Sequence, residues 1–330
     1  MRFFVYEHIT GGGFMGSALP ASLAEEGELM VRALIRDLLD IPGAEVLAMR
    51  DGRLPSLSRP VRNFIPSQAE PADGLFRHCC VVADAVWPIA PESSGILENI
   101  SRVALDCSRV LLGSSPDAIR VSGNKLITAR LLARAGIAVV PAYAEFAALP
   151  AEFSRVVIKP ADGAGCVDTY LLERAAARRW WLDHDHGNYL LQAFIDGDAL
   201  SLSMLCRTGE AKLLCINRQR VIVENGKFRF TGVGVNELAD REGIYARLAG
   251  EIAAAIPGLW GYVGVDLIQT AQGPLVLEVN PRLTTSYVGL REALRCNPAA
   301  LVLGLIDAAP GEHQIPFYAR SVEIEACHVG

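Results

Sequence analysis

The stretch from residue 262 to residue 282, YVGVDLIQTAQGPLVLEVNPR, is the most informative part of this chain for its fold. Two largely apolar runs, VGVDLIQ and PLVLEVN, flank the turn signal TAQG. If the turn is centred at residues 271–272, Asp266 lies opposite Glu278 in an antiparallel hairpin. Side chains alternate along a strand, so Glu278 and Asn280 share one face. The stretch therefore predicts a β-hairpin that gathers oxygen ligands on one side.

Asp266, Glu278 and Asn280 are candidate metal ligands. Two carboxylates and an amide oxygen are hard ligands, suited to Mg²⁺ held against phosphates. Arg282 follows in VNPR and adds a cation at the same end of the hairpin. The alternative is an ordinary hairpin with one solvated face.

Two lysines precede this hairpin in the sequence. Lys125 lies in SGNKLITARLLARAG, and Lys159 ends the apolar run VVIK and is followed by PADGAG. A lysine at a strand end can reach phosphate as a point charge, and a glycine-rich turn can present backbone N–H groups to an anion. The spacing is not that of a P-loop, which requires GxxxxGK[ST]. A solvated strand end is the alternative for Lys159.

Further polar residues are candidates for contacts with nucleotide or substrate. Arg218 and Arg220 in INRQR are candidates for a γ-phosphate or an acyl-phosphate, with paired surface charges as the alternative. The backbone after the strand NYLL is a candidate for adenine, and Asp198 is a candidate for a ribose hydroxyl.

Two loops are candidates for substrate contacts. Glu7, His8 and Thr10 lie past the end of the first predicted strand, where α/β folds bind ligands. A structural role is the alternative for His8. Residues 284–286 follow the hairpin and could donate hydrogen bonds to an acid substrate, with an ordinary polar loop as the alternative.

Composition excludes some classes of protein. The 330 residues suggest two or three domains, and the net charge of −6 argues against nucleic acid as the main partner. No apolar run approaches the roughly 20 residues of a membrane helix. The eight cysteines show no CxxC spacing, which favours reduced thiols in a cytoplasmic protein over a zinc site.

Strand and helix signals divide the chain into two regions. Alternating strands and helices over 1–113 predict a parallel, helix-covered sheet, with one helix over 22–40 and a strand within residues 78–90. One helix is predicted over 116–135. Beyond it, the sequence predicts strands with antiparallel pairing and helices near 175–186, 241–258 and 297–309.

The order of these elements resembles the ATP-grasp superfamily over about 114–310. Lys125, then IKP with its glycine loop, QAFIDG, Asp266 and EVNPR follow one another in family order. The resemblance implies an α/β (α+β) fold class, an ATP-grasp fold with an N-terminal Rossmann-like pre-ATP-grasp domain. It implies that domain at 1–113, an N-terminal lobe with a glycine-rich lid at 114–190, and a C-terminal lobe with the Mg-binding hairpin at 191–330.

The resemblance also implies an ADP-forming carboxylate–amine ligase that uses ATP and Mg²⁺, with Mn²⁺ as an expected substitute. The implied nucleotide contacts are Lys125, Lys159, Asp162, Gly163, Ala164, Gly165, Gln192, Ala193, Phe194, Ile195 and Asp198. The implied metal ligands are Asp266, Glu278 and Asn280, and the implied catalytic residues are Arg218 and Arg282. The implied substrate contacts are Thr10, Gly11, Gly12, Arg220, Thr284, Thr285 and Ser286. Ala193 stands where the family commonly has an acid, and Asp198 where it commonly has Glu.

Two segments, EHITGGG and NPRLTTSYVG, look like the tyramine–glutamate ligases of methanofuran biosynthesis. That resemblance implies an amide bond between L-glutamate and tyramine or tyrosine, formed through an acyl-phosphate. The implied partners are small-molecule substrates, with no nucleic acid and no membrane, and a homodimer is left open. Another ATP-grasp ligase, joining other amino acids or a dipeptide, is the alternative.

Two other function classes remain as remote alternatives. Gly11, Gly13 and Gly16 fit the GxGxxG pattern of a nicotinamide oxidoreductase, but EHIT separates them from the strand, whereas a phosphate turn needs them at the strand–helix junction. A non-catalytic nucleotide-binding regulator would not need an intact set of metal ligands.

Overall fold

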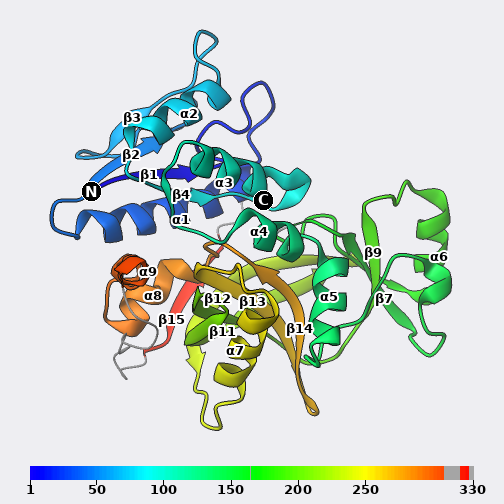
Figure 1. Ribbon diagram of the computed structural model, residues 1–330. Coiled ribbons are helices and arrows are strands. Elements are labelled where there is room, and N and C mark those ends of the chain that lie inside the picture. The colour runs from blue at the N-terminus through cyan, green and yellow to red at the C-terminus, as the bar shows by residue number, and fades with distance from the viewer. Residues whose placement is uncertain (164, 308–319, 327–330) are drawn as a thin grey trace.

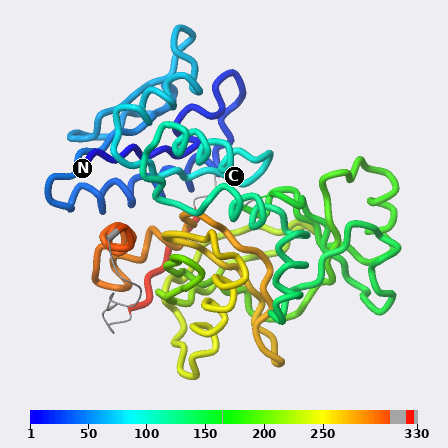
Figure 2. Tube along the Cα trace, viewed as in Figure 1, coloured from blue at the N-terminus to red at the C-terminus, as the bar shows by residue number. Residues whose placement is uncertain are grey.

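Two β-sheets organise the computed structural model, which describes residues 1–163, 165–307 and 320–326. In Figure 1 the first sheet and its helices, blue to cyan, lie above the second sheet. The continuous trace in Figure 2 shows the same arrangement. Within the described residues, no helix is both long and apolar enough to cross a membrane.

The first sheet is parallel throughout and has the order β3-β2-β1-β4-β5. Its strands are β1 (Arg2–Glu7), β2 (Glu45–Met49), β3 (Arg62–Phe64), β4 (Ala85–Ile89) and β5 (Val110–Leu111). Its helices are α1 (Ala21–Leu39), α2 (Ala72–Val82) and α3 (Ile96–Asp106). The predicted parallel, helix-covered sheet is confirmed.

The strand predicted within residues 78–90 is confirmed as β4, and the first part of that stretch belongs to a helix. Cys79 and Cys80 lie in α2, and β4 begins at Ala85. Buried Leu75 and Phe76 precede the two cysteines at helical spacing, so four apolar residues form one helix face. The unbroken run of apolar residues masks this helical spacing in the sequence.

The single helix predicted over 116–135 is wrong, because two helices stand there, α4 (Pro116–Ser122) and α5 (Lys125–Arg134). Asn124 separates them and accepts hydrogen bonds from the backbone N–H groups of Leu126 and Ile127, both at 3.1 Å. This is an N-cap, which satisfies N–H groups that a new helix leaves without partners. The cap places Lys125 in the first turn of α5.

The second sheet contains ten strands in the order β14-β13-β10-β11-β12-β8-β7-β9-β6, with β15 also paired to β12. Its first five strands are β6 (Ala142–Tyr143), β7 (Arg155–Pro160), β8 (Tyr170–Glu173), β9 (Tyr189–Ala193) and β10 (Asp198–Arg207). The others are β11 (Glu210–Glu224), β12 (Lys227–Leu238), β13 (Gly261–Thr270), β14 (Gly273–Asn280) and β15 (Val322–Glu325). Sequence reasoning missed β3, β8, β12 and β15.

The remaining helices are α6 (Arg174–Asp183), α7 (Ile244–Ala255), α8 (Tyr287–Leu294) and α9 (Pro298–Asp307), and the short 3₁₀ helices are η1 (Ser93–Gly95) and η2 (Phe146–Ala148). Of these helices, α8 was not predicted. One hydrophobic core joins both sheets, because Trp87 of β4, Leu34 of α1 and Tyr287 of α8 belong to the same buried cluster. The two sheets and their helices therefore share one core at this junction.

Candidate functional site

The β13–β14 hairpin brings the predicted metal ligands together. Asp266 pairs directly with Glu278, and a two-residue turn joins Thr270 to Gly273, as the sequence predicts. The amide Nδ2 of Asn280 donates to Oδ2 of Asp266 at 3.2 Å. Turning that amide over would present its oxygen instead, the atom a cation requires. Asp266, Glu278 and Asn280 thus form one set of oxygen ligands.

Both predicted lysines meet this hairpin, and both are only 7% exposed. Lys125 Nζ lies 3.0 Å from Oε2 of Glu278 and donates to the carbonyl of Gly163 at 2.5 Å. Lys159 ends the buried part of β7 and interacts electrostatically with Glu278 and Lys125. The structure therefore places two cations beside the carboxylates.

The charged groups of this cluster shift one another's pKa values. Burial raises the pKa of Glu278, but Lys125 and Lys159 outweigh it and hold that pKa at about 2. Burial and the neighbouring Glu278 raise the pKa of Asp266 well above its usual value. Burial lowers the pKa of Lys159 to about 8, with Lys125 adding to the effect and Glu278 opposing it. The site therefore carries closely coupled charges of both signs before any ligand binds.

A glycine-containing loop joins β7 to β8, and its described residues, 161–163 and 165–169, lie over these groups; we call these residues the lid. The carboxylate of Asp162 accepts hydrogen bonds from the backbone N–H of Ser94 at 2.9 Å and from Asn188 Nδ2 at 2.6 Å. Gly165 has a φ of +67°, the left-handed region that favours glycine. The predicted contact Ala164 lies outside the described residues. Ser94 belongs to η1, which is part of the first sheet's half of the chain, and Asn188 belongs to the other half. The lid is therefore tied to both halves.

Arg282, a predicted catalytic residue, makes a two-point ion pair with Glu92. Its Nε lies 2.9 Å from Oε1 and its NH2 nitrogen 3.1 Å from Oε2, and the two side chains are 12% and 7% exposed. Glu92 stands between β4 and α3. The pair joins the two halves of the chain next to the hairpin, and a catalytic role for Arg282 stays a prediction.

Arg218 and Arg220 lie in a chain of ion pairs on β11. Arg218 contacts Asp198 at 3.0 Å and Glu237 at 2.9 Å. Arg220 contacts Glu237 at 2.6 Å and Glu323 of β15 at 3.0 Å. The alternative of paired charges therefore describes these two arginines in this structure. Their roles toward phosphate or substrate, and that of Asp198 toward ribose, stay predictions.

Of the residues predicted to contact adenine, Gln192 and Ala193 end β9 itself, and Phe194 and Ile195 follow it. Gln192 is buried and its Nε2 donates to the carbonyl of Val140 at 3.3 Å, while Ala193 is also buried. The guanidinium of Arg155 stacks over the Phe194 ring at 4.2 Å, and the N–H of Phe194 donates to the carbonyl of Arg155 at 3.1 Å. Ile195, which follows, is partly buried.

The loop after β1 is held by its own side chains. Thr10 donates to Oε2 of Glu7 twice, from its backbone N–H and from its hydroxyl, both at 2.6 Å. A Cβ on Gly11 would lie 2.4 Å from the Glu7 carbonyl, and a Cβ on Gly12 2.6 Å from Pro66. A Cβ on Gly13 would overlap the His8 ring. The structure supports a structural role for His8, while substrate contacts of Thr10, Gly11 and Gly12 stay predictions.

The hydroxyl residues after the hairpin differ in their surroundings. The hydroxyl of Thr284 lies 2.9 Å from that of Tyr262, which lies 3.0 Å from the Ser203 hydroxyl. Ser286 is buried at the start of α8, and Thr285 interacts with Glu26 of α1. Thr285 therefore interacts with a carboxylate of the first sheet's side.

Sequence reasoning missed three residues of this site, Glu26, Glu92 and Gln219. Gln219 donates from Nε2 to Oδ1 of Asp266 at 2.9 Å. Alternation along INRQR places Gln219 on the opposite strand face from the two arginines, so that period could have revealed it. Glu92 carries no such signal, because its partner Arg282 is 190 residues away in sequence.

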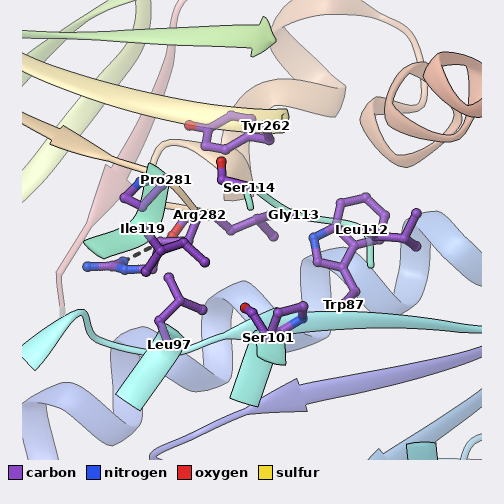
Figure 3. Close-up of a pocket in the computed structure, with 12 residues that line it drawn as sticks. Trp87, Leu97, Ser101, Leu112, Gly113, Ser114, Ile119, Tyr262, Pro281 and Arg282 are labelled. Carbon is purple, nitrogen blue, oxygen red and sulfur yellow. Dashed lines mark hydrogen bonds between the residues drawn. The ribbon is translucent and has the colours of Figure 1, made fainter. Parts of the chain in front are cut away.

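A small cavity lies beside Arg282, between the two halves of the chain. Figure 3 shows Trp87, Leu97 and Ser101 on one side of it and Tyr262 and Arg282 on the other. Its volume is about 10 Å³, the room that one water molecule requires. The cavity is therefore too small for a nucleotide, and it belongs to the interface between the two halves.

Two family models match this chain. The model described as "ATP-grasp domain" matches residues 122–286, half of the chain, and the one described as "pre ATP-grasp 3 domain" matches residues 44–119. The chain belongs to the ATP-grasp family. The first match includes Lys125, Lys159 and the whole β13–β14 hairpin, so the charge cluster lies inside the family's domain.

One characterised protein is similar to this chain over more than half of its length. The chain is 30% identical over 208 residues to the tyramine–L-glutamate ligase of Methanocaldococcus jannaschii, a match that covers 63% of this chain and 58% of that relative. The chain thus spans less than two thirds of the relative's length.

Two solved structures show the same fold as this ATP-grasp chain. A protein from Archaeoglobus fulgidus, assigned to the ATP-grasp superfamily, has a TM-score of 0.75 and 24% identity over 98% of this chain and 92% of its own. The biotin carboxylase domain dimer of Hydrogenobacter thermophilus 2-oxoglutarate carboxylase, in complex with the magnesium salt of ADP, has a TM-score of 0.68 and 15% identity. That match covers 97% of this chain and 72% of the other.

Proposed function

We propose that this ATP-grasp chain is an ADP-forming ligase that joins L-glutamate to tyramine or a closely related aromatic amine. The observation that carries the proposal is the contact of Lys125 with Glu278, directly opposite Asp266 and beside buried Lys159. The relative named tyramine–L-glutamate ligase supports the choice of substrates.

The ligand set of the hairpin fits Mg²⁺. Two carboxylates and an amide are hard donors. Within the described residues, His, Cys, Asp and Glu side chains by themselves form no group of three or more that could hold a metal. Asp266, Glu278 and Asn280 would hold the ion, and phosphate oxygens of ATP would complete its shell. Bound there, Mg²⁺ would supply Lewis-acid stabilisation of phosphate charge. We propose Mn²⁺ as a substitute.

The chain's own residues would work mainly by positioning and charge. Lys125 and Lys159 would bind the phosphates, and Lys125 would exchange its contact with Glu278 for a phosphate oxygen. A carboxylate of glutamate would attack the γ-phosphorus, releasing ADP and forming an acyl-phosphate. The amine, having lost its ammonium proton to solvent, would then attack the acyl carbon as R–NH₂. The carbon–oxygen bond to phosphate would break, and the phosphate would take the proton that the new amide nitrogen releases. The lid would exclude water that could hydrolyse the acyl-phosphate.

We also propose the division into parts at 1–113, 114–190 and 191–330, a cytoplasmic location and a homodimer. The two-sheet arrangement supports the first boundary, and the seven free cysteines among the described residues are consistent with a reducing compartment. The dimeric carboxylase domain is a precedent for the dimer. Limited proteolysis and light scattering would test the boundaries and the assembly.

The deciding experiment measures ADP release with MgATP, L-glutamate and a panel of amines that includes tyramine, tyrosine and simple amino acids, with product mass recorded. Release that requires glutamate and an aromatic amine, with a product mass equal to their sum minus water, is the expected result. Release with another pair would keep a ligase and reject these substrates. ATP binding without release for any pair would reject the proposal.

A further inference from the structure

Glu26 lies on the face of α1 that meets the candidate site. Leu23, Glu26 and Gly27 are three and four residues apart, so they project from one side of the helix. A Cβ added at Gly165 in the lid would lie 3.5 Å from Leu23. A Cβ added at Gly27 would lie 2.5 Å from the carboxylate of Glu7. Glu26 is therefore placed between the lid and the end of β1.

Arg282 and Thr285, which follow the hairpin, and Cys166 of the lid interact with this carboxylate. Burial raises the pKa of Glu26, while Arg282 and the hydroxyl of Thr285 lower it. The charge of Glu26 also contributes to the raised pKa of the Cys166 thiol in the lid. Glu26 keeps part of its surface exposed. It thus faces the site from the first sheet's side and remains accessible to a ligand.

The balance of charge around Glu26 favours a cation as that ligand. Arg282 already makes its two-point ion pair with Glu92. The carboxylate of Glu7 is engaged by the backbone N–H groups of Ile9 and Thr10. The Arg282 guanidinium that interacts with Glu26 is therefore matched by another carboxylate, and Glu26 adds negative charge beyond that pair.

We propose that Glu26 binds an ammonium group of a substrate. This inference rests on the proposed ligase function, because that reaction brings ammonium groups to the site. The amine enters as R–NH₃⁺, and glutamate carries an α-ammonium. A carboxylate that receives hydrogen bonds from an ammonium forms a charge-assisted contact, stronger than a neutral hydrogen bond. Glu26 would thereby hold the bound substrate in register with the acyl-phosphate.

The test compares Glu26→Gln with the wild-type enzyme by steady-state kinetics. Gln keeps the size of the side chain and removes its charge, so KM should rise about tenfold to a hundredfold for the substrate whose ammonium is bound. KM for ATP should stay unchanged. Glu25→Gln is the matched control, because residue 25 is one position earlier and about 100° around the helix. It should leave every KM within about twofold of wild type.

Hydroxylamine distinguishes the two sources of the ammonium. It is neutral near pH 7.5 and can trap an acyl-phosphate as a hydroxamate. If Glu26 binds the amine substrate, Glu26→Gln should keep wild-type hydroxamate formation and show a raised KM for the amine alone. If Glu26 binds the α-ammonium of glutamate, hydroxamate formation should require more glutamate.

An unchanged KM for both substrates in a folded Glu26→Gln enzyme would overturn the inference. If that variant does not fold, Glu26→Ala removes the carboxylate altogether. Unchanged KM values for both substrates in Glu26→Ala would then overturn it, and a raised KM for one ammonium substrate would support it. Wild-type enzyme that makes neither hydroxamate nor amide would instead reject the proposed function.

Discussion

Arg282 and Glu92, 190 positions apart in the chain, form a two-point ion pair at the junction of the two sheets. Both side chains are almost fully enclosed, so each charge depends on the other for the interactions that water would otherwise supply. Breaking such a pair from one side leaves a buried charge without its partner.

Glu92→Ala is therefore expected to lower the free energy of unfolding by about 3–5 kcal/mol. Chemical denaturation, followed by circular dichroism, measures the change. Glu224→Ala is the matched control, since the Glu224–Arg229 pair is exposed and its loss should cost less than about 1 kcal/mol. Equal effects of the two substitutions would show that the buried Arg282–Glu92 pair stabilises the fold no more than an exposed ion pair does.

Gly27→Ala should destabilise the protein although it lies within a helix. Replacing glycine by alanine in a helix interior ordinarily stabilises by about 1 kcal/mol. Here the new Cβ would lie 2.5 Å from the Glu7 carboxylate, so a loss of about 1–3 kcal/mol is expected. Gly250→Ala in α7, where nothing lies within 4 Å, should give the ordinary gain. Thermal unfolding of the two variants should therefore shift in opposite directions.

Nucleotide affinity should fall as pH rises through about 8. Lys159 binds phosphate as an ammonium, and its lowered pKa of about 8 means that the free enzyme loses this charge above that pH. Calorimetric titration with ADP without divalent metal, from pH 7.5 to 9.5, measures the effect. Lys159→Met should bind ADP weakly and without this pH dependence. A constant affinity of the wild-type protein over that range would contradict the assignment of Lys159 to the phosphates.

Asp266→Asn and Lys159→Ala are each expected to reduce ADP release at least about a hundredfold while the fold is retained. The first removes a carboxylate from the metal ligands, and the second removes a phosphate cation. Chelation of divalent metal should stop wild-type turnover, and added Mg²⁺ should restore it. Glu224→Gln serves as a surface control. Near-normal turnover in either variant would remove that residue from the active site.

The register of the β13–β14 hairpin was predictable because a two-residue turn and strand alternation fix which side chains oppose each other. The structure confirms the predicted pairing of Asp266 with Glu278. The break between α4 and α5 was not predicted, although Asn124 after a glycine is a recognisable cap. Sequence spacing alone favoured one continuous helix.

Other parts of the site depend on contacts between distant segments. The ion pairs of Arg220 with Glu323 and of Arg282 with Glu92 arise from the packing of separate elements, and no local pattern indicates them. Strands β8 and β12 were missed because polar and apolar residues mix along YLLE and KFRFTGVGVNEL. The roles of the nucleotide contacts still await the experiments above.

The pairing of β15 with β12 has a consequence for handling this protein. Residues 322–325 pair with residues 232–235 of β12, and this pairing satisfies backbone groups along one edge of that strand. An exposed strand edge is a template on which another chain can add a strand. Protein produced without residues 320–326 would present this template to its neighbours, so we expect it to precipitate or form oligomers on concentration even if its nucleotide site folds normally.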